Sequence, residues 1–85
     1  MTDRNYDVCV VGGAGHVGLP LGIAFAEANK RVMLYDTNRK SLETIAQGKM
    51  PFMEKGAEES LRKVLQKTLF VSSDKTVISR SRFVI

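Results

Sequence analysis

The sequence predicts an α/β fold built on a Rossmann-like, doubly wound parallel sheet, incomplete, with three strands and the start of a fourth. Short β-branched apolar runs alternate with longer stretches in which apolar residues recur at helical spacing, the pattern of strand–helix–strand units. The first run ends in a pair of glycines, and the second ends in an acid, Asp36. With 85 residues, 44% of them hydrophobic, the chain has enough material for one domain and not for two.

The first half of the chain predicts a strand, a glycine turn, a helix and a second strand. Residues 6–11 are mostly apolar, with an unbroken apolar run over 8–11 and no polar alternation in it, which indicates a strand buried on both faces. Residues 16–28 carry one charge, Glu27, and exceed the usual length of a strand, so they predict a helix packed closely against a flat surface. Pro20 fits the first turn of this helix, because its missing N–H would have no intrahelical partner there. Residues 31–36 then predict the second strand.

A second helix and a loop follow. Thr37 or Asn38 can cap the N-terminus of this helix. Gly48 occupies the position just past its C-terminus, where a glycine commonly ends a helix. Residues 49–56 contain a proline and a glycine and predict a loop.

The last third predicts a third helix over residues 57–66, with Glu–Arg and Glu–Lys pairs four residues apart on its exposed side. Residues 68–72 predict a third strand, and Ser73-Asp74 can cap a short helical turn. Residues 83–85 then predict the start of a fourth, buried strand, and we expect the sheet order third, second, first, fourth. Since a chain usually ends in polar residues, this apolar ending leads us to expect that residues 1–85 are the front of a longer protein.

Composition excludes several classes of function. The net charge is +4, but the basic residues are scattered between Arg4 and Arg82, unlike the clustered charge of a nucleic-acid-binding face. No stretch reaches the roughly 18 apolar residues of a membrane span, and polar residues such as Asp3 precede the first apolar run, unlike a signal peptide. A single cysteine, Cys9, allows no internal disulfide or thiol pair for a metal, so we expect an inert core residue in a cytoplasmic protein.

The pattern G-x-G-x-x-G begins at Gly13, follows the first predicted strand and opens the first predicted helix. Gly13 permits the tight turn, Gly15 lets the backbone approach a pyrophosphate, and Gly18 allows close packing of helix and strand. Asp36 lies eighteen residues beyond Gly18, near the spacing expected for the acid that binds a ribose. Its charge repels a 2′-phosphate, so the motif favours NAD over NADP.

Other interpretations of these residues stay open. The glycines could serve only a tight turn, with Asp36 capping the next helix. His16 could line the phosphate site or pack beside the turn, and Arg39 and Lys40 could reach the adenine or a phosphate or remain solvated.

Three segments carry a resemblance to a known family: Gly-Gly-Ala-Gly-His-Val-Gly-Leu-Pro-Leu at 12–21, Tyr-Asp at 35–36 and Pro-Phe-Met-Glu-Lys-Gly at 51–56. With them, the chain resembles the N-terminal NAD-binding domain of the UDP-glucose/GDP-mannose dehydrogenase family from about residue 6 to 85. The resemblance implies that Asp36 holds the adenosine ribose and that the pyrophosphate is surrounded by Gly13, Gly15, His16, Val17 and Gly18.

Members of this family oxidise the C6 alcohol of a nucleotide sugar to a carboxylate, using two NAD in succession through a thiohemiacetal and a thioester on a catalytic cysteine. The resemblance implies a parent enzyme, commonly dimeric, that acts on a UDP-sugar for polysaccharide synthesis. The catalytic groups and the sugar-binding domain of the family lie beyond Ile85, so Cys9 is not the catalytic thiol. We therefore expect no catalytic residue within the chain and no dehydrogenase activity from it alone.

The chain departs from the family pattern at three places. Gly12 replaces an aliphatic residue, which we expect to loosen the end of the first strand. Ser41 stands where some members have a basic residue near the adenine, a role that Arg39 or Lys40 could take. Lys55 replaces a proline, which leaves Glu54 either near the substrate or as an ordinary acid at a helix N-terminus.

Two rival functions use the same glycine turn. A 3-hydroxyacyl-CoA or β-hydroxyacid dehydrogenase shares the turn and the acid, but it normally lacks the loop at residues 51–56. A non-catalytic nucleotide-sensing module, as in regulatory domains of potassium channels, would bind NAD without turnover.

Overall fold

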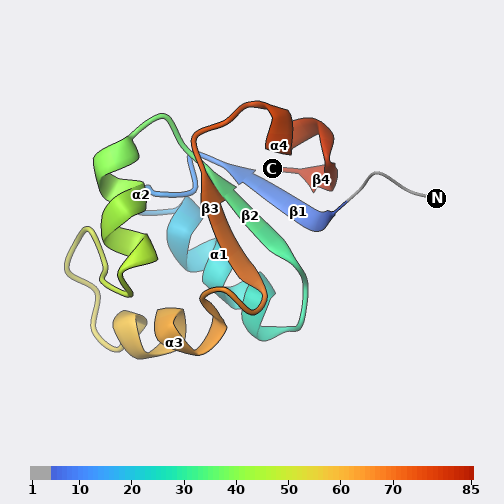
Figure 1. The fold of residues 1–85 in the computed structure, drawn as a ribbon. Coiled ribbons are helices and arrows are strands. Elements are labelled where there is room, and N and C mark those ends of the chain that lie inside the picture. The colour runs from blue at the N-terminus through green and yellow to red at the C-terminus, as the bar shows by residue number, and fades with distance from the viewer. Residues whose placement is uncertain (1–4) are drawn as a thin grey trace.

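The computed structural model describes residues 5–85 and shows a four-stranded sheet between layers of helices (Figure 1). All of its pairings are parallel, in the order β3-β2-β1-β4, as predicted from the sequence. The strands are β1 (Tyr6–Val11), β2 (Val32–Tyr35), β3 (Leu69–Ser72) and β4 (Ser81–Val84). Residues 1–4, which include the Asp3 used above against a signal peptide, lie outside the described residues.

Helices cover the two faces of the sheet unequally. The first face carries α1 (Gly18–Glu27), α2 (Arg39–Ala46) and α3 (Ala57–Val64), and their apolar residues form the main core with strand residues such as Leu34. The second face carries α4 (Thr76–Ser79), which packs through Val77 on Cys9, Met33 and Tyr35. The doubly wound architecture is therefore confirmed, with its second layer only begun (Figure 1).

The two ends of α2 follow the capping residues in the sequence. Of the two candidates, Asn38 caps α2, because its side chain accepts a hydrogen bond from the backbone N–H of Ser41 at 3.0 Å. Gly48 adopts φ +82° just beyond α2, and the Asp74 side chain accepts from the N–H of Thr76 at the start of α4.

Helix α3 is shorter than predicted, ending at Val64 and not at residue 66. Leu65 is extended and forms a parallel bridge with Leu69, and Gln66 adopts φ +65°. The chain has to reverse here to enter β3, so tertiary pairing overrides the helical preference of these residues. Both predicted ion pairs of α3 are present, with N···O distances of 3.4 Å and 3.9 Å.

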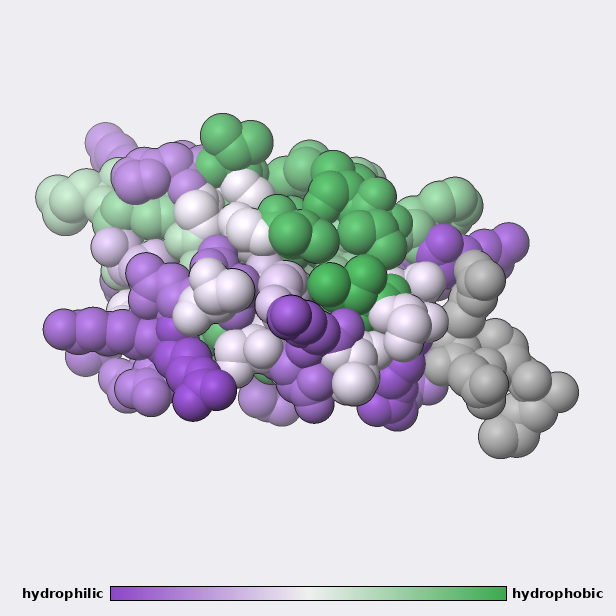
Figure 2. All heavy atoms as spheres, turned by 90° about the horizontal axis from the view of Figure 1, so that it is seen from above, coloured by the Kyte–Doolittle hydropathy of each residue, from purple (hydrophilic) through white to green (hydrophobic). Residues whose placement is uncertain are grey.

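The expectation that the fourth strand is buried was wrong. Phe83 is 62% exposed and Val84 51%, because β4 is an edge strand that pairs only with β1 within the described chain. The single turn of α4 covers little of this edge. Seen from above, apolar side chains gather on the surface around β4 and the end of the chain (Figure 2).

Cys9 is buried in the sheet, as predicted, with no exposed surface. Burial raises the pKa of its thiol, and a hydrogen bond with Ser81 offsets this only in part. A raised pKa means less thiolate at neutral pH, so we expect a thiol reagent at pH 8 to label the native chain at least about 100-fold more slowly than the unfolded chain. Mass spectrometry of timed samples with and without denaturant measures this ratio, and equal rates would contradict the buried assignment.

Candidate functional site

The turn between β1 and α1 is closed by hydrogen bonds to its own backbone and to β2. The N–H groups of Gly12 and Gly13 both donate to the carbonyl of Tyr35, at 2.9 Å and 3.0 Å, and the carbonyl of Gly12 accepts from Gly15 at 3.0 Å. Gly12 adopts φ +77°, a conformation that glycine reaches without strain. The expectation that Gly12 loosens the strand end was therefore wrong. The positive φ of this residue allows the backbone to form the hydrogen-bonded turn.

Two glycines of the motif are required by close contacts. A Cβ atom on Gly13 would lie 2.7 Å from the Cβ of Leu34, and one on Gly18 would lie 2.4 Å from the carbonyl oxygen of Gly12. Both distances are far below an ordinary van der Waals contact. The tight turn expected at Gly13 is therefore observed, whereas Gly18 allows the start of α1 to approach the backbone of that turn and not a strand. Gly15 differs, because its Cβ would meet only the Gly12 carbonyl oxygen at 3.3 Å.

The start of α1 presents unpaired donors. Among residues 5–85, no acceptor takes the backbone N–H groups of His16, Val17 or Gly18, while the next N–H, that of Leu19, donates to the Gly15 carbonyl. Val17 is 80% exposed, so the turn is open to solvent. Free N–H groups at the positive end of a helix dipole are suited to bind a phosphate.

Asp36 lies directly beside this turn. Its Oδ2 accepts from the N–H of Ala14 at 3.0 Å, and its Oδ1 accepts from the N–H of Asn38 at 2.9 Å. The carboxylate therefore connects the glycine turn to the loop before α2. Each oxygen retains acceptor capacity after one such bond, so the half-buried group can also accept from hydroxyl groups of a ligand.

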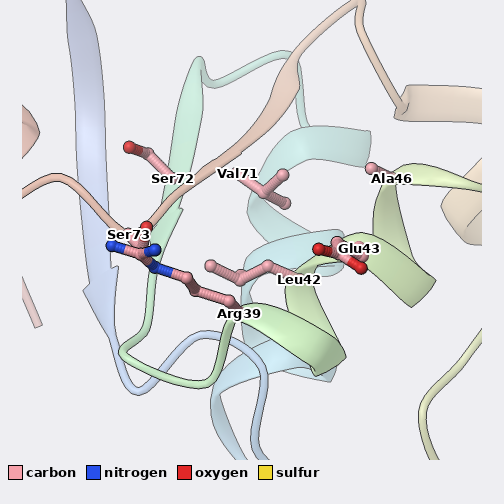
Figure 3. Close-up of a pocket in the computed structure, with 7 residues that line it drawn as sticks. All are labelled: Arg39, Leu42, Glu43, Ala46, Val71, Ser72 and Ser73. Carbon is pink, nitrogen blue, oxygen red and sulfur yellow. The ribbon is translucent and has the colours of Figure 1, made fainter.

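The two basic candidates of α2 occupy different surroundings. Arg39 lines a pocket of about 320 Å³ between α2 and β3, and its side chain extends toward Ser73 (Figure 3). Asp36 is next to this pocket, because its N–H donates to the carbonyl of Ser72 in the neighbouring strand. Lys40 is exposed and is not among the residues that line the pocket.

His16 packs beside the turn on a residue that sequence reasoning did not select. Its ring stacks on Phe52, with centroids 4.1 Å apart and planes 21° apart. The two residues are 36 positions apart, and the sequence between them carries no pattern that predicts this contact. Glu54 in the same loop is exposed, close to the start of α3, and its role stays a prediction.

Two negative findings apply to residues 5–85. No group of three or more His, Cys, Asp and Glu side chains there is placed to hold a metal ion. No helix in that range has the length and apolar character to cross a membrane.

Comparisons with known proteins agree with this geometry. Residues 6–85 match the UDP-glucose/GDP-mannose dehydrogenase family, NAD binding domain. UDP-glucose 6-dehydrogenase from Pseudomonas aeruginosa is 38% identical over 55 residues, which are 65% of this chain and 12% of that protein.

Solved structures of nucleotide-sugar dehydrogenases share the fold. A ternary complex of GDP-mannose dehydrogenase from Pseudomonas aeruginosa superposes with a TM-score of 0.80 at 25% identity, covering 92% of this chain and 19% of that one. A UDP-glucose dehydrogenase from the hyperthermophilic archaeon Pyrobaculum islandicum gives 0.74 at 29% identity, covering 85% and 17%. The chain thus spans less than a fifth of the length of these relatives. It belongs to the UDP-glucose/GDP-mannose dehydrogenase family, whose NAD binding domain matches residues 6–85.

Proposed function

We propose that the chain binds the ADP half of NAD at the glycine turn. The observation that carries the proposal is the placement of three unpaired N–H groups, at residues 16–18, beside the Asp36 carboxylate. The N–H groups and Gly15 receive the pyrophosphate, while Asp36 accepts hydrogen bonds from the adenosine ribose. Gly13 and Gly18 maintain the turn.

Four residues complete the proposed site. Val17 borders the pyrophosphate through its backbone, and His16 lies beside it on the turn. Arg39 faces the adenosine side from its pocket, and Lys40 adds positive charge in the same turn of α2.

For the whole protein we propose NAD-dependent oxidation of the C6 alcohol of a UDP-sugar to a carboxylate, in an oligomeric enzyme of the cytoplasm. The nucleotide-sugar dehydrogenases to which the chain is similar support this reaction over the hydroxyacid dehydrogenase and sensing-module alternatives. Bound NAD supplies the hydride acceptor. This chain's own residues hold and orient the adenosine end, and substrate binding and catalysis belong to regions beyond residue 85.

Titration of the chain with NAD, NADH and NADP, followed by backbone amide shifts in NMR, tests the cofactor proposal. We expect the amides of residues 13–18 to move with NAD and NADH and to respond at least about tenfold more weakly to NADP, because the Asp36 charge opposes a 2′-phosphate. A well-folded chain whose amides at residues 13–18 do not respond to NAD would overturn the proposal.

Substitution of Asp36 tests whether its carboxylate binds the ribose of NAD. Asp36→Asn retains one acceptor oxygen and removes the charge, and it should weaken NAD binding by roughly 10- to 100-fold, since a hydrogen bond to a charged group contributes about 1.5–3 kcal/mol. Asp74→Ala is the matched control, because Asp74 also accepts a backbone N–H after a strand but lies at α4. Equal NAD affinity in the Asp36 variant and the control would exclude ribose binding by Asp36.

A further inference from the structure

The loop between α2 and α3, residues 49–56, is anchored at its first residues by side chains of α3. The carboxylate of Glu58 accepts a hydrogen bond from the N–H of Met50 at 3.2 Å, and the Nε of Arg62 donates to the carbonyl of Gly48 at 3.0 Å. Since α3 packs on α1, these anchors fix the loop relative to the helix that begins at the glycine turn.

Within this loop, one side chain points inward and its neighbour points outward. Phe52 is half-buried and packs against the main core, whereas Met53 is fully exposed at 101%. Besides packing on the core, the Phe52 ring stacks on His16. The loop and the glycine turn therefore contact each other through these two rings.

The stack restricts a side chain that is otherwise on the surface. His16 is exposed, and an exposed side chain samples several rotamers unless a contact selects one. Face-to-face packing on Phe52 occupies one face of the imidazole and leaves its edge, which carries both ring nitrogens, available to an anion. Because the unpaired N–H groups belong to the same few residues, the ring is held next to the proposed phosphate site.

We propose that Phe52 is a positioning residue for the cofactor: by stacking on the His16 imidazole, it holds that ring beside the pyrophosphate of NAD. This rests on the proposed function. Because the stack fixes the His16 ring before NAD binds, less side-chain conformational entropy is lost on binding. Phe52 therefore increases the affinity for NAD without contacting it.

The test measures the dissociation constants of NAD, ADP-ribose and adenosine for Phe52→Leu, Phe52→Tyr and Met53→Ala. Leucine keeps an apolar side chain toward the core but cannot stack, tyrosine keeps the ring, and Met53 is the exposed neighbour. We expect Phe52→Leu to bind NAD and ADP-ribose about three- to tenfold more weakly, with adenosine unchanged because it has no phosphate. Phe52→Tyr and Met53→Ala should match the original chain.

A double-mutant cycle with His16→Ala separates positioning from simple support of the fold. The Phe52→Leu effect on NAD affinity should disappear in the His16→Ala background, because no ring remains to be held. If the effect persists there, or if adenosine weakens equally, Phe52 acts through the fold and the inference is overturned. If Phe52→Leu changes no affinity, the inference fails while the proposed function stands, and an original chain that binds no NAD overturns both.

Discussion

Gly18→Ala is expected to destabilise the chain by about 3 kcal/mol, near the upper end of what overpacking a core position costs. Its new Cβ would lie 2.4 Å from the carbonyl oxygen of Gly12 and 3.1 Å from the Cα of Gly13, so both contacts are with backbone atoms that cannot rotate away. A domain of this size has a stability of only roughly 5–10 kcal/mol, so the loss is a large part of the total.

Urea denaturation of the two proteins, followed by circular dichroism, gives the difference in free energy of unfolding. Gly56→Ala is the matched control, because a Cβ there meets no atom within 4 Å and only the φ of +78° opposes it. That left-handed conformation costs an L residue roughly 1–2 kcal/mol. If Gly18→Ala were no less stable than this control, the close contact between helix and turn would not exist as described.

Much of the fold could be predicted because its signals are local. Residues 8–11 form an uninterrupted apolar run next to a pair of glycines, and the structure places β1 at Tyr6–Val11. The cap at Asn38 and the glycine end at Gly48 were also recognisable, since capping depends on the chemistry of one residue and its nearest neighbours.

The predictions that were wrong depended on distant parts of the chain. The apolar run at residues 83–85 has the composition of a buried strand, but its exposure depends on what covers an edge of the sheet. Leu65 fits the apolar face of a helix equally well, and only its pairing with Leu69 assigns it to the turn. Gly12 was expected to loosen the strand end because it lacks an aliphatic side chain. Its role in the structure comes from its positive φ, which the turn requires.

The same limit applies to the candidate site. The glycine motif and Asp36 were identified by spacing along the chain, but the hydrogen bond from Ala14 to Asp36 joins residues 22 positions apart. That bond gives Asp36 a structural role beside its proposed contact with ribose. This structural role differs from the helix cap considered from the sequence, which Asn38 provides. It does not exclude the proposed contact with ribose, because a carboxylate has enough acceptor sites for both.

Gly15→Ala is expected to separate cofactor binding from folding. Its Cβ would meet only the Gly12 carbonyl oxygen, at 3.3 Å, and its φ does not lie in the left-handed region, so stability should fall by no more than about 1 kcal/mol. The new methyl group occupies the place where the backbone approaches the pyrophosphate. Binding of NAD should weaken at least about tenfold, the effect of losing one hydrogen bond to a charged group.

Calorimetric titration with NAD and urea denaturation of the same samples measure both quantities. Gly56→Ala again serves as the control, because it should lose stability and retain affinity, the reverse of Gly15→Ala. Two glycine substitutions with opposite effects cannot both be explained by general damage to the fold. If Gly15→Ala binds NAD as tightly as the original chain, the pyrophosphate does not approach the backbone at Gly15, and the glycine turn is a structural feature of the sheet alone.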